Sequence, residues 1–396
     1  MKKLLLISLC ACATTQMYGA LSRLKTAATA LSATLKKSAP RSFTATSTLK
    51  KTVSDTIWKT KEGQVLRVMG DMHMPSDKPY FELLKSSLEE IDKAGHKTTV
   101  VIEGGFDESA PIPEIMRDRF NTNAITKLNT FAKTASFKNV GLHLTQVRTE
   151  QHFINFTSSF ILINTFLDLL DNESWRSLLK DEYIPTFKGY FLNPQIFKCF
   201  NADNLEKIDA HLTEFVTQLK TFITQKNNSD ITTLFTASIE QTNQFLRVLN
   251  HLKKIDLTKA ESLTQKHFAT LDVATFIEIA MEIQKALLLK NAHVKECTML
   301  LSPMNVSSLY ITLEDAEILM RLLTATKAHN NFITYAGLAH TLNINKALET
   351  RGFNQVKHDG PTVFDPSKVL SWGLDEKTIE SNNALFLGLL QGGRLS

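Results

Sequence analysis

Cysteine is scarce in this chain, and its scarcity excludes several kinds of site. Only 4 of the 396 residues are cysteine, and they include no C-x-x-C pair, so a structural zinc site built on cysteine is not expected. Cys10 and Cys12 lie in the first segment, which leaves Cys199 and Cys297 for the folded part. We expect both to be buried thiols in apolar, helix-like surroundings, with a single disulfide bond as the alternative.

The sequence also lacks the signatures of several common enzyme classes. It contains no H-x-x-x-H pair, no G-x-S-x-G elbow, no P-loop and no G-x-G-x-x-G, which argues against a zincin, a serine hydrolase of the α/β type and a nucleotide-binding enzyme. The excess of positive charge is small, because the net charge of +5 becomes +3 without Lys2 and Lys3. That value is too low to predict nucleic-acid binding.

Residues 1–20 have the form of a bacterial secretory signal peptide. Two lysines precede the apolar run Leu4–Ala13, which is too short to span a bilayer, and Gly19-Ala20 offers a cleavage point. The stretch Leu9–Cys12 also resembles a lipoprotein box, so lipidation at Cys12 is an alternative to plain cleavage. We therefore expect an extracytoplasmic protein, located in the periplasm, in the envelope or secreted.

Residues 21–59 are basic and rich in Ser, Thr and Ala. They contain eight Lys or Arg residues against one acid, Asp55, which predicts a flexible leader between the signal peptide and the folded part. A basic leader can make a peripheral contact with an anionic membrane surface, or it can serve only as a linker.

From residue 60 the pattern is that of an α/β protein. Val65–Met69 and Thr98–Ile102 are apolar runs that predict buried strands. Between them, residues 79–95 carry apolar side chains at helical spacing, begin with proline in the first turn and end at Gly95. Strand, helix and strand in this order predict a right-handed βαβ unit, whose two parallel strands we place side by side.

Metal-capable side chains follow both strands. Asp71 and His73 come after the first strand, and Glu103 ends the second. In open α/β sheets, ligands bind outside the carboxyl ends of the strands, and carboxylate with imidazole suits a divalent metal or acid–base chemistry. The simpler alternatives are a turn aspartate, a packed histidine and a helix-capping or solvated glutamate.

Two later strands point to the same edge of the sheet. Val140–Thr145 leads into Arg148, and Phe332–Tyr335 leads into His340, which precedes a helix closed by Gly352. We therefore predict a mainly parallel sheet with flanking helices, on whose rim Asp71, His73 and Glu103 join these two residues.

A long helical insert separates the two halves of this α/β domain. Residues 150–308 contain Phe, Ile and Leu at helical spacing, which predicts the seams of a helical bundle. The predicted domain order is thus signal peptide (1–20), leader (21–59), first half of the α/β domain (60–149), insert (150–308), and second half with a C-terminal tail (309–396).

The candidate residues stand in the order of a known family. They form the boxes Gly70-x-x-His73, Glu103 at a strand end, Arg148 after a later strand, and Gly337-x-x-His340 followed by a helix and Gly352-Phe353. This order resembles the TraB/PrgY group and its Tiki metalloprotease relatives, and more remotely ChaN-like and erythromycin-esterase-like proteins. The likeness covers residues 65–148 and 313–356, and an acidic helix around Asp315 stands where the family has one.

Two family positions differ in this chain. Asp71 stands where the first box usually has threonine, and Val147 replaces the aspartate before Arg148. The resemblance implies a metal-dependent hydrolase that uses Mn, Co or Zn and that acts as a peptidase in the Tiki-like members. His73, His340, Glu103 and Asp71 are then the candidate metal ligands. Glu103 and Arg148 are the candidate catalytic residues, as base and as oxyanion stabiliser.

Two alternatives use the same rim. The first is a non-catalytic member that binds a ligand or partner there. The second is a metallophosphoesterase, because Asp71-x-His73 also resembles the first box of that family, although Gly104-Gly105-Phe106-Asp107 is a poor version of its second box. The substrate, whether a peptide or a small molecule, is not specified by these motifs.

Overall fold

The computed structural model describes residues 52–71, 79–104, 124–145, 197, 199–226, 228–288, 303–363 and 373–392. The chain divides into two compact units. Unit 1 comprises residues 1–105, 119–149 and 314–396, and unit 2 comprises residues 106–118 and 150–313. Unit 1 is therefore assembled from stretches of chain on both sides of unit 2 in the sequence.

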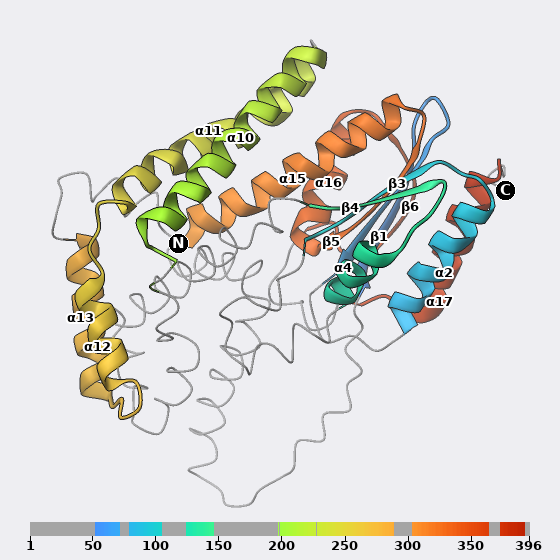
Figure 1. Ribbon diagram of the computed structural model, residues 1–396. Coiled ribbons are helices and arrows are strands. Elements are labelled where there is room, and N and C mark those ends of the chain that lie inside the picture. The colour runs from blue at the N-terminus through green and yellow to red at the C-terminus, as the bar shows by residue number, and fades with distance from the viewer. Residues whose placement is uncertain are drawn as a thin grey trace, which may run out of the picture. The chain divides into compact units, whose positions relative to one another are not determined.

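Unit 1 is built on a six-stranded sheet with the order β4-β3-β5-β2-β1-β6 (Figure 1). The strands are β1 (Thr52–Lys59), β2 (Val65–Asp71), β3 (Thr98–Ile102), β4 (Val140–Leu144), β5 (Asn331–Gly337) and β6 (Asn354–Asp359). The pairs β2–β5, β3–β5 and β3–β4 are parallel, and β1 runs antiparallel to both β2 and β6. The predicted α/β class with a mainly parallel sheet is confirmed.

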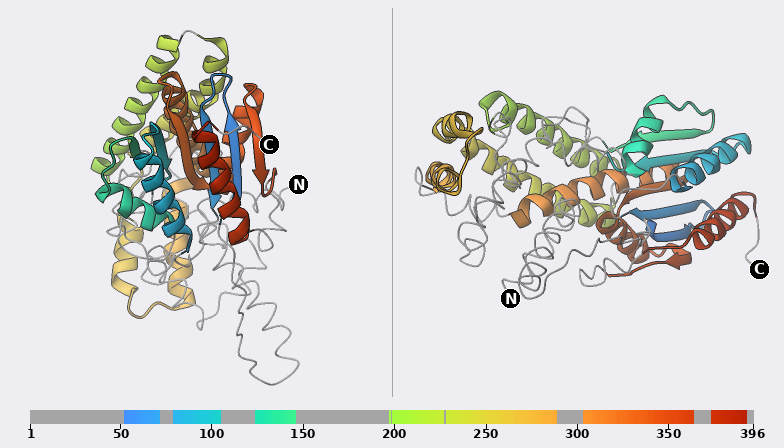
Figure 2. Two further views of the ribbon diagram at one scale, coloured as in Figure 1. Left: turned by 90° about the vertical axis from the view of Figure 1, so that its right-hand side faces the viewer. Right: turned by 90° about the horizontal axis from the view of Figure 1, so that it is seen from below.

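Helices flank both faces of this sheet. They are α2 (Pro79–Lys93), α4 (Ala124–Thr134), α16 (Leu338–Thr350) and α17 (Glu376–Leu390), together with the end of α15 (Pro303–Lys327). On one face, the apolar sides of α2, α4 and α17 pack against alternate strand residues such as Val65, Met69 and Val100. Figure 2 shows α17 and α2 in front of the sheet when it is viewed from that side.

The opposite face of the sheet carries α16. This helix packs against β2, β1 and β5, and its Asn345 accepts a hydrogen bond from the Trp58 indole at 2.9 Å and donates one to Thr56 at 3.0 Å. Every residue of β2 is buried, as expected for a central strand that is covered on both faces.

The predicted end of the flexible leader is wrong, because residues 52–59 form strand β1 of the sheet. Val53, Ile57 and Trp58 are buried there, and Asp55 accepts two hydrogen bonds from Arg67 of β2, at 2.7 and 3.0 Å. The charge count over residues 21–59 did not reveal this strand, because Asp55 is the single acid among eight basic residues. In the structure Asp55 lies within the strand and pairs with the buried Arg67. Residues 1–51, with the predicted signal peptide and Cys12, lie outside the described residues.

The predicted adjacency of the first two parallel strands is also wrong, because β5 lies between β2 and β3. Leu66 of β2 pairs in register with Phe332, and Thr99 of β3 pairs with the same residue from the other side. A strand from more than 200 residues later thus occupies the centre of the unit. Its carboxyl end, from which α16 continues directly, therefore lies between the carboxyl ends of β2 and β3.

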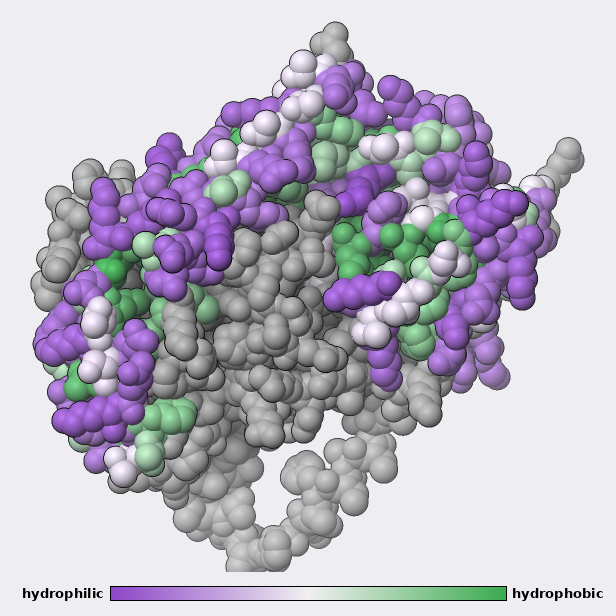
Figure 3. Space-filling model, viewed as in Figure 1, coloured by the Kyte–Doolittle hydropathy of each residue, from purple (hydrophilic) through white to green (hydrophobic). Residues whose placement is uncertain are grey.

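The described part of unit 2 is helical, as the apolar spacing predicts. Its helices are α10 (Ala202–Lys226), α11 (Ser229–Leu252), α12 (Thr258–His267) and α13 (Val273–Leu288), followed by the beginning of α15. The predicted stripe of α10 is buried at Leu212, Phe215, Val216 and Leu219, and the visible side of α10 and α11 is largely hydrophilic (Figure 3).

Two further observations concern unit 2 and the described helices as a whole. Cys199 is buried, and Cys297 lies outside the described residues. None of the helices that the structure describes combines the length and the apolar character needed to span a bilayer.

Candidate metal centre

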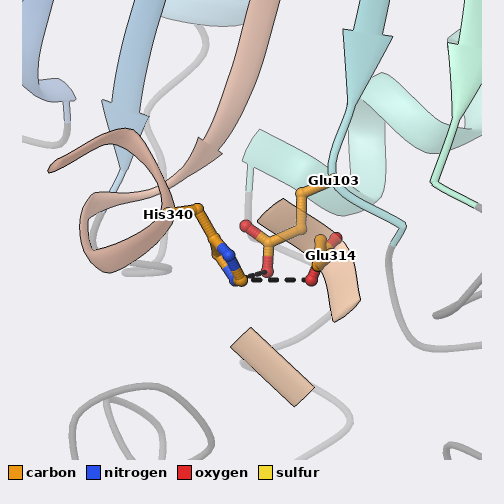
Figure 4. Close-up of side chains that lie close together, drawn as sticks. All are labelled: Glu103, Glu314 and His340. Atoms are coloured by element: carbon orange, nitrogen blue, oxygen red, sulfur yellow. Dashed lines mark ion pairs between the residues drawn. The ribbon is translucent and has the colours of Figure 1, made fainter. Parts of the chain in front are cut away.

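Three acidic or imidazole side chains of unit 1 converge at the carboxyl end of the sheet. They are Glu103, Glu314 and His340, and each offers a ligand atom within 4.8 Å of the others. The Nε2 atom of His340 lies 3.3 Å from Oε2 of Glu314 and 3.8 Å from Oε1 of Glu103 (Figure 4). All three side chains are almost inaccessible to solvent, with exposed fractions of 0 to 1%.

Glu103 is held at the start of α16. It follows β3 directly, and its backbone N–H donates to the carbonyl of Tyr335 in β5 at 2.9 Å. Its Oε2 atom accepts a hydrogen bond from the N–H of Gly337, the residue that ends β5 and caps α16. A carboxylate at this position is favoured by the positive end of the helix dipole, and its Oε1 atom faces His340.

Glu314 is held by a threonine from the end of β4. The hydroxyl of Thr145 donates to Oε1 of Glu314 at 2.6 Å and accepts from the N–H of Gly104 at 2.7 Å. Thr145 therefore connects the ends of β3 and β4 to α15 through one buried hydroxyl. The other oxygen of Glu314, Oε2, is the one nearest to the imidazole.

His340 is held by a second acid of α15. Its Nδ1 atom lies 2.8 Å from Oδ1 of Asp315, and Oδ2 of Asp315 accepts a hydrogen bond from Asn343 at 2.8 Å. Since Nδ1 is engaged in this way, Nε2 is the ring atom that points to the two glutamates (Figure 4). His340 lies in the first turn of α16, just after the strand end at which the sequence placed it.

The cluster is strongly negative for a buried site. Burial alone would lower the pKa of His340, but the carboxylates of Glu314, Glu103 and Asp315 outweigh it and raise that pKa to about 9. Burial raises the pKa of Asp315, while its hydrogen bonds from His340 and Asn343 act in the opposite direction. Three carboxylates against one imidazole leave a negative charge that a bound divalent cation would offset.

The distances fit a metal ion. A zinc ion binds histidine nitrogen and carboxylate oxygen at about 2.1 Å, so two ligands at a tetrahedral angle lie about 3.4 Å apart. The separations of 3.3 and 3.8 Å around Nε2 of His340 are close to that value. This buried Glu–Glu–His cluster could therefore hold a divalent metal.

The structure brings together only some of the predicted site residues. Glu103 and His340 meet, as expected. Asp71 is buried at the end of β2, in register with Gly337 of β5, but it is not one of the three grouped ligand residues. His73 and Arg148 lie outside the described residues, so their predicted roles stay predictions.

Glu314 was missed by sequence reasoning. A signal existed, because Leu313-Glu314-Asp315-Ala316-Glu317 places three acids in a helix whose neighbouring residues are apolar. All five residues are buried, which is rare for charged side chains without a binding or pairing role.

No protein-family model, curated protein or solved structure matches this chain. The assignment of a function therefore depends on the geometry of the cluster and on the residues that orient it.

Proposed function

We propose that unit 1 is a metal-dependent hydrolase whose ion is held by Glu103, Glu314 and His340. The observation that carries this proposal is the convergence of three buried ligand atoms within 4.8 Å of one another. Each ligand residue is oriented by a separate hydrogen bond: Glu103 accepts from Gly337, Glu314 accepts from Thr145, and the His340 imidazole is bonded to the accepting carboxylate of Asp315. Such outer contacts are typical of sites that bind metal, where they fix ligand orientation.

The donor set indicates the kind of ion and its use. Two carboxylates and one imidazole suit Mn²⁺, Co²⁺ or Zn²⁺, and three protein ligands leave room for water or substrate, as in catalytic sites. The chemistry that such an ion supplies is Lewis-acid activation of water and of a substrate oxygen. The role of the protein residues is to hold the ion, neutralise its charge and exclude bulk water.

The resemblance to the TraB/PrgY–Tiki-like group supports this proposal. Glu103 and His340 are the acid and the second histidine of its boxes, and both contribute to the cluster. Within the proposal, His73 adds a ligand, Asp71 adds a ligand or shapes the turn before it, and Arg148 stabilises the developing oxyanion. The substrate class is a peptide or another small molecule with a hydrolysable carbonyl.

The proposed activity takes place outside the cytoplasm. The support is the signal-like segment of residues 1–20, with its apolar run and its Gly19-Ala20 step. The basic residues after it, or a lipid on Cys12, would then give a peripheral membrane contact. Mass spectrometry of the protein secreted by a bacterial host distinguishes cleavage after Ala20 from lipidation at Cys12, and an uncut N-terminus would contradict both.

Metal binding tests the proposal directly. We expect the purified protein to bind one Mn²⁺, Co²⁺ or Zn²⁺ per chain in isothermal titration calorimetry, and the His340→Ala and Glu314→Gln variants to lose at least tenfold in affinity. Glu317→Gln is the matched control, because Glu317 is a buried acid of the same helix that pairs with Arg321 at 3.0 Å instead. Equal metal affinity in all four proteins would refute the proposed site.

Turnover assays then separate the classes of function. Cleavage of peptides that is lost with EDTA and with His340→Ala supports a hydrolase of the Tiki-like kind. Hydrolysis of a generic phosphodiester without peptide cleavage would instead identify a metallophosphoesterase. Metal binding without any turnover would favour the non-catalytic alternative.

A further inference from the structure

We propose that Asp315 is a positioning residue that orients the His340 imidazole and makes Nε2 its metal-binding atom. The inference rests on the proposed metal site and adds a residue that is not itself a ligand. It predicts that metal affinity depends on a carboxylate that never touches the ion.

The contacts of Asp315 exclude it from the ligand set. Its Oδ1 lies 2.8 Å from Nδ1 of His340, and its Oδ2 accepts from Asn343 at 2.8 Å. Both oxygens are thus engaged by α16, and Asp315 is not among the three residues whose ligand atoms converge. The adjacent residue of α15, Glu314, is the one that reaches the cluster.

The hydrogen bond determines which nitrogen of His340 can bind a metal. A carboxylate oxygen only accepts hydrogen bonds, so the proton of the neutral ring lies on Nδ1 and the lone pair lies on Nε2. Nε2 is the atom that lies 3.3 Å from Glu314 and 3.8 Å from Glu103. The partial negative charge that Asp315 induces on the ring also makes Nε2 a stronger ligand.

Asn343 keeps the Asp315 carboxylate in place. It lies three residues after His340 on α16, so the two side chains project from the same side of the helix. Both contact Asp315, one at each oxygen, and this two-point contact connects α15 to α16. Rotation of the Asp315 carboxylate would break one of the two hydrogen bonds.

The chain offers a matched control on the same helix. Glu317 is buried like Asp315 and two residues further along α15, but its Oε1 pairs with Arg321 at 3.0 Å. Removing the charge of Glu317 therefore disturbs a buried acid of α15 without touching the contact to His340. A general effect of charge loss on α15 would appear in both variants.

The test compares metal affinity and Co²⁺ absorption spectra of the wild type with those of Asp315→Asn, Asp315→Ala and Glu317→Gln. We expect Asp315→Ala to weaken Zn²⁺ and Co²⁺ binding by 10- to 100-fold and to change the Co²⁺ d–d bands, which report ligand geometry. Asp315→Asn retains an acceptor without the charge and is expected to lose less. Glu317→Gln is expected to match the wild type in both measurements.

The outcomes distinguish this inference from the proposed function. Wild-type affinity and spectrum in Asp315→Ala, together with loss of binding in His340→Ala, would overturn the role of Asp315 and leave the metal site standing. A wild type that binds no metal would overturn both. If circular dichroism shows that Asp315→Ala does not fold, Asp315→Asn and Asn343→Leu decide, and unchanged affinity and spectrum in these two variants would reject the inference.

Discussion

A single hydroxyl, that of Thr145, carries two of the contacts that shape the cluster. It donates to Glu314 at 2.6 Å and accepts from the N–H of Gly104 at 2.7 Å, and the residue is fully buried. Removal of this group would leave a buried N–H without its acceptor and a carboxylate without its donor. A buried polar group that has lost its hydrogen-bond partner destabilises a fold more than the loss of a contact at the surface does.

We predict that Thr145→Val destabilises the protein by about 1–3 kcal/mol and weakens metal binding about tenfold. Urea unfolding and calorimetric titration with Zn²⁺ measure the two effects. Thr334→Val is the matched control, because the Thr334 hydroxyl is equally buried but has no hydrogen-bond partner among the described residues. If both variants behave alike, the hydroxyl of Thr145 does not orient Glu314.

At the scale of the elements, Gly70 explains part of the first sequence box. A Cβ atom at this position of β2 would lie 2.7 Å from Oγ1 of Thr341 and 3.1 Å from Cβ of Ser54. Thr341 follows His340 in the first turn of α16, and its hydroxyl donates to the carbonyl of Leu338 at 2.9 Å. Glycine is therefore needed for α16 to approach β2 closely enough to place His340.

We predict that Gly70→Ala destabilises the protein by about 1–3 kcal/mol through overpacking and lowers metal affinity by moving α16. Adding Thr341→Ala removes Oγ1, the atom nearest to the new Cβ, and is expected to restore part of the lost stability and part of the lost metal affinity. The effects of the two substitutions in a double-mutant cycle are then non-additive. Gly388→Ala in α17 is the control, since a Cβ there meets no atom within 4 Å. Simple additivity of the two changes would contradict this account.

The strands and helices themselves were largely predictable. The apolar runs at residues 65–69 and 98–102 correspond to β2 and β3, and the helices predicted after Pro79 and before Gly352 are present as α2 and α16. Each helix is followed, two residues after its last residue, by a glycine with a left-handed backbone, Gly95 and Gly352, with φ of 77° and 71°. Local spacing is enough for such elements, because each depends on residues that are close together in the sequence.

At the scale of the whole molecule, a metal ion would join distant parts of the chain. Glu103 follows β3, whereas Glu314 and His340 come from α15 and α16, on the other side of unit 2 in the sequence. Any ligand that binds only the folded state stabilises it by RT ln(1 + [L]/Kd). The site is therefore coupled to the stability of unit 1.

We predict that this coupling depends on pH. The pKa of His340 is raised from 6.5 to about 9, so its charged form stabilises the metal-free fold fully below about pH 6.5, and this contribution is lost as pH rises through about 9. A metal must displace that proton, so its affinity is expected to rise about tenfold per pH unit between pH 7 and 9. Thermal unfolding with Zn²⁺ and with EDTA at pH 7, 8 and 9 measures both trends.

The unfolding temperature of the metal-loaded protein should therefore exceed that of the EDTA-treated protein by a difference that grows as pH rises from 7 to 9. The variant His340→Gln removes the titrating group and should show no such divergence. A constant difference between the two conditions in the wild type would mean that His340 is not the group that a metal displaces.

The sequence by itself determined the α/β class, the identity of most strands and two members of the cluster, Glu103 and His340. These depend on apolar periodicity and on the position of polar residues at strand ends, which are local properties. The tertiary structure decided that β5 lies between β2 and β3 and that Glu314 and Asp315 belong to the site. Those features depend on contacts between residues far apart in the chain, such as Glu103 with Gly337, and no local pattern encodes which distant partners meet.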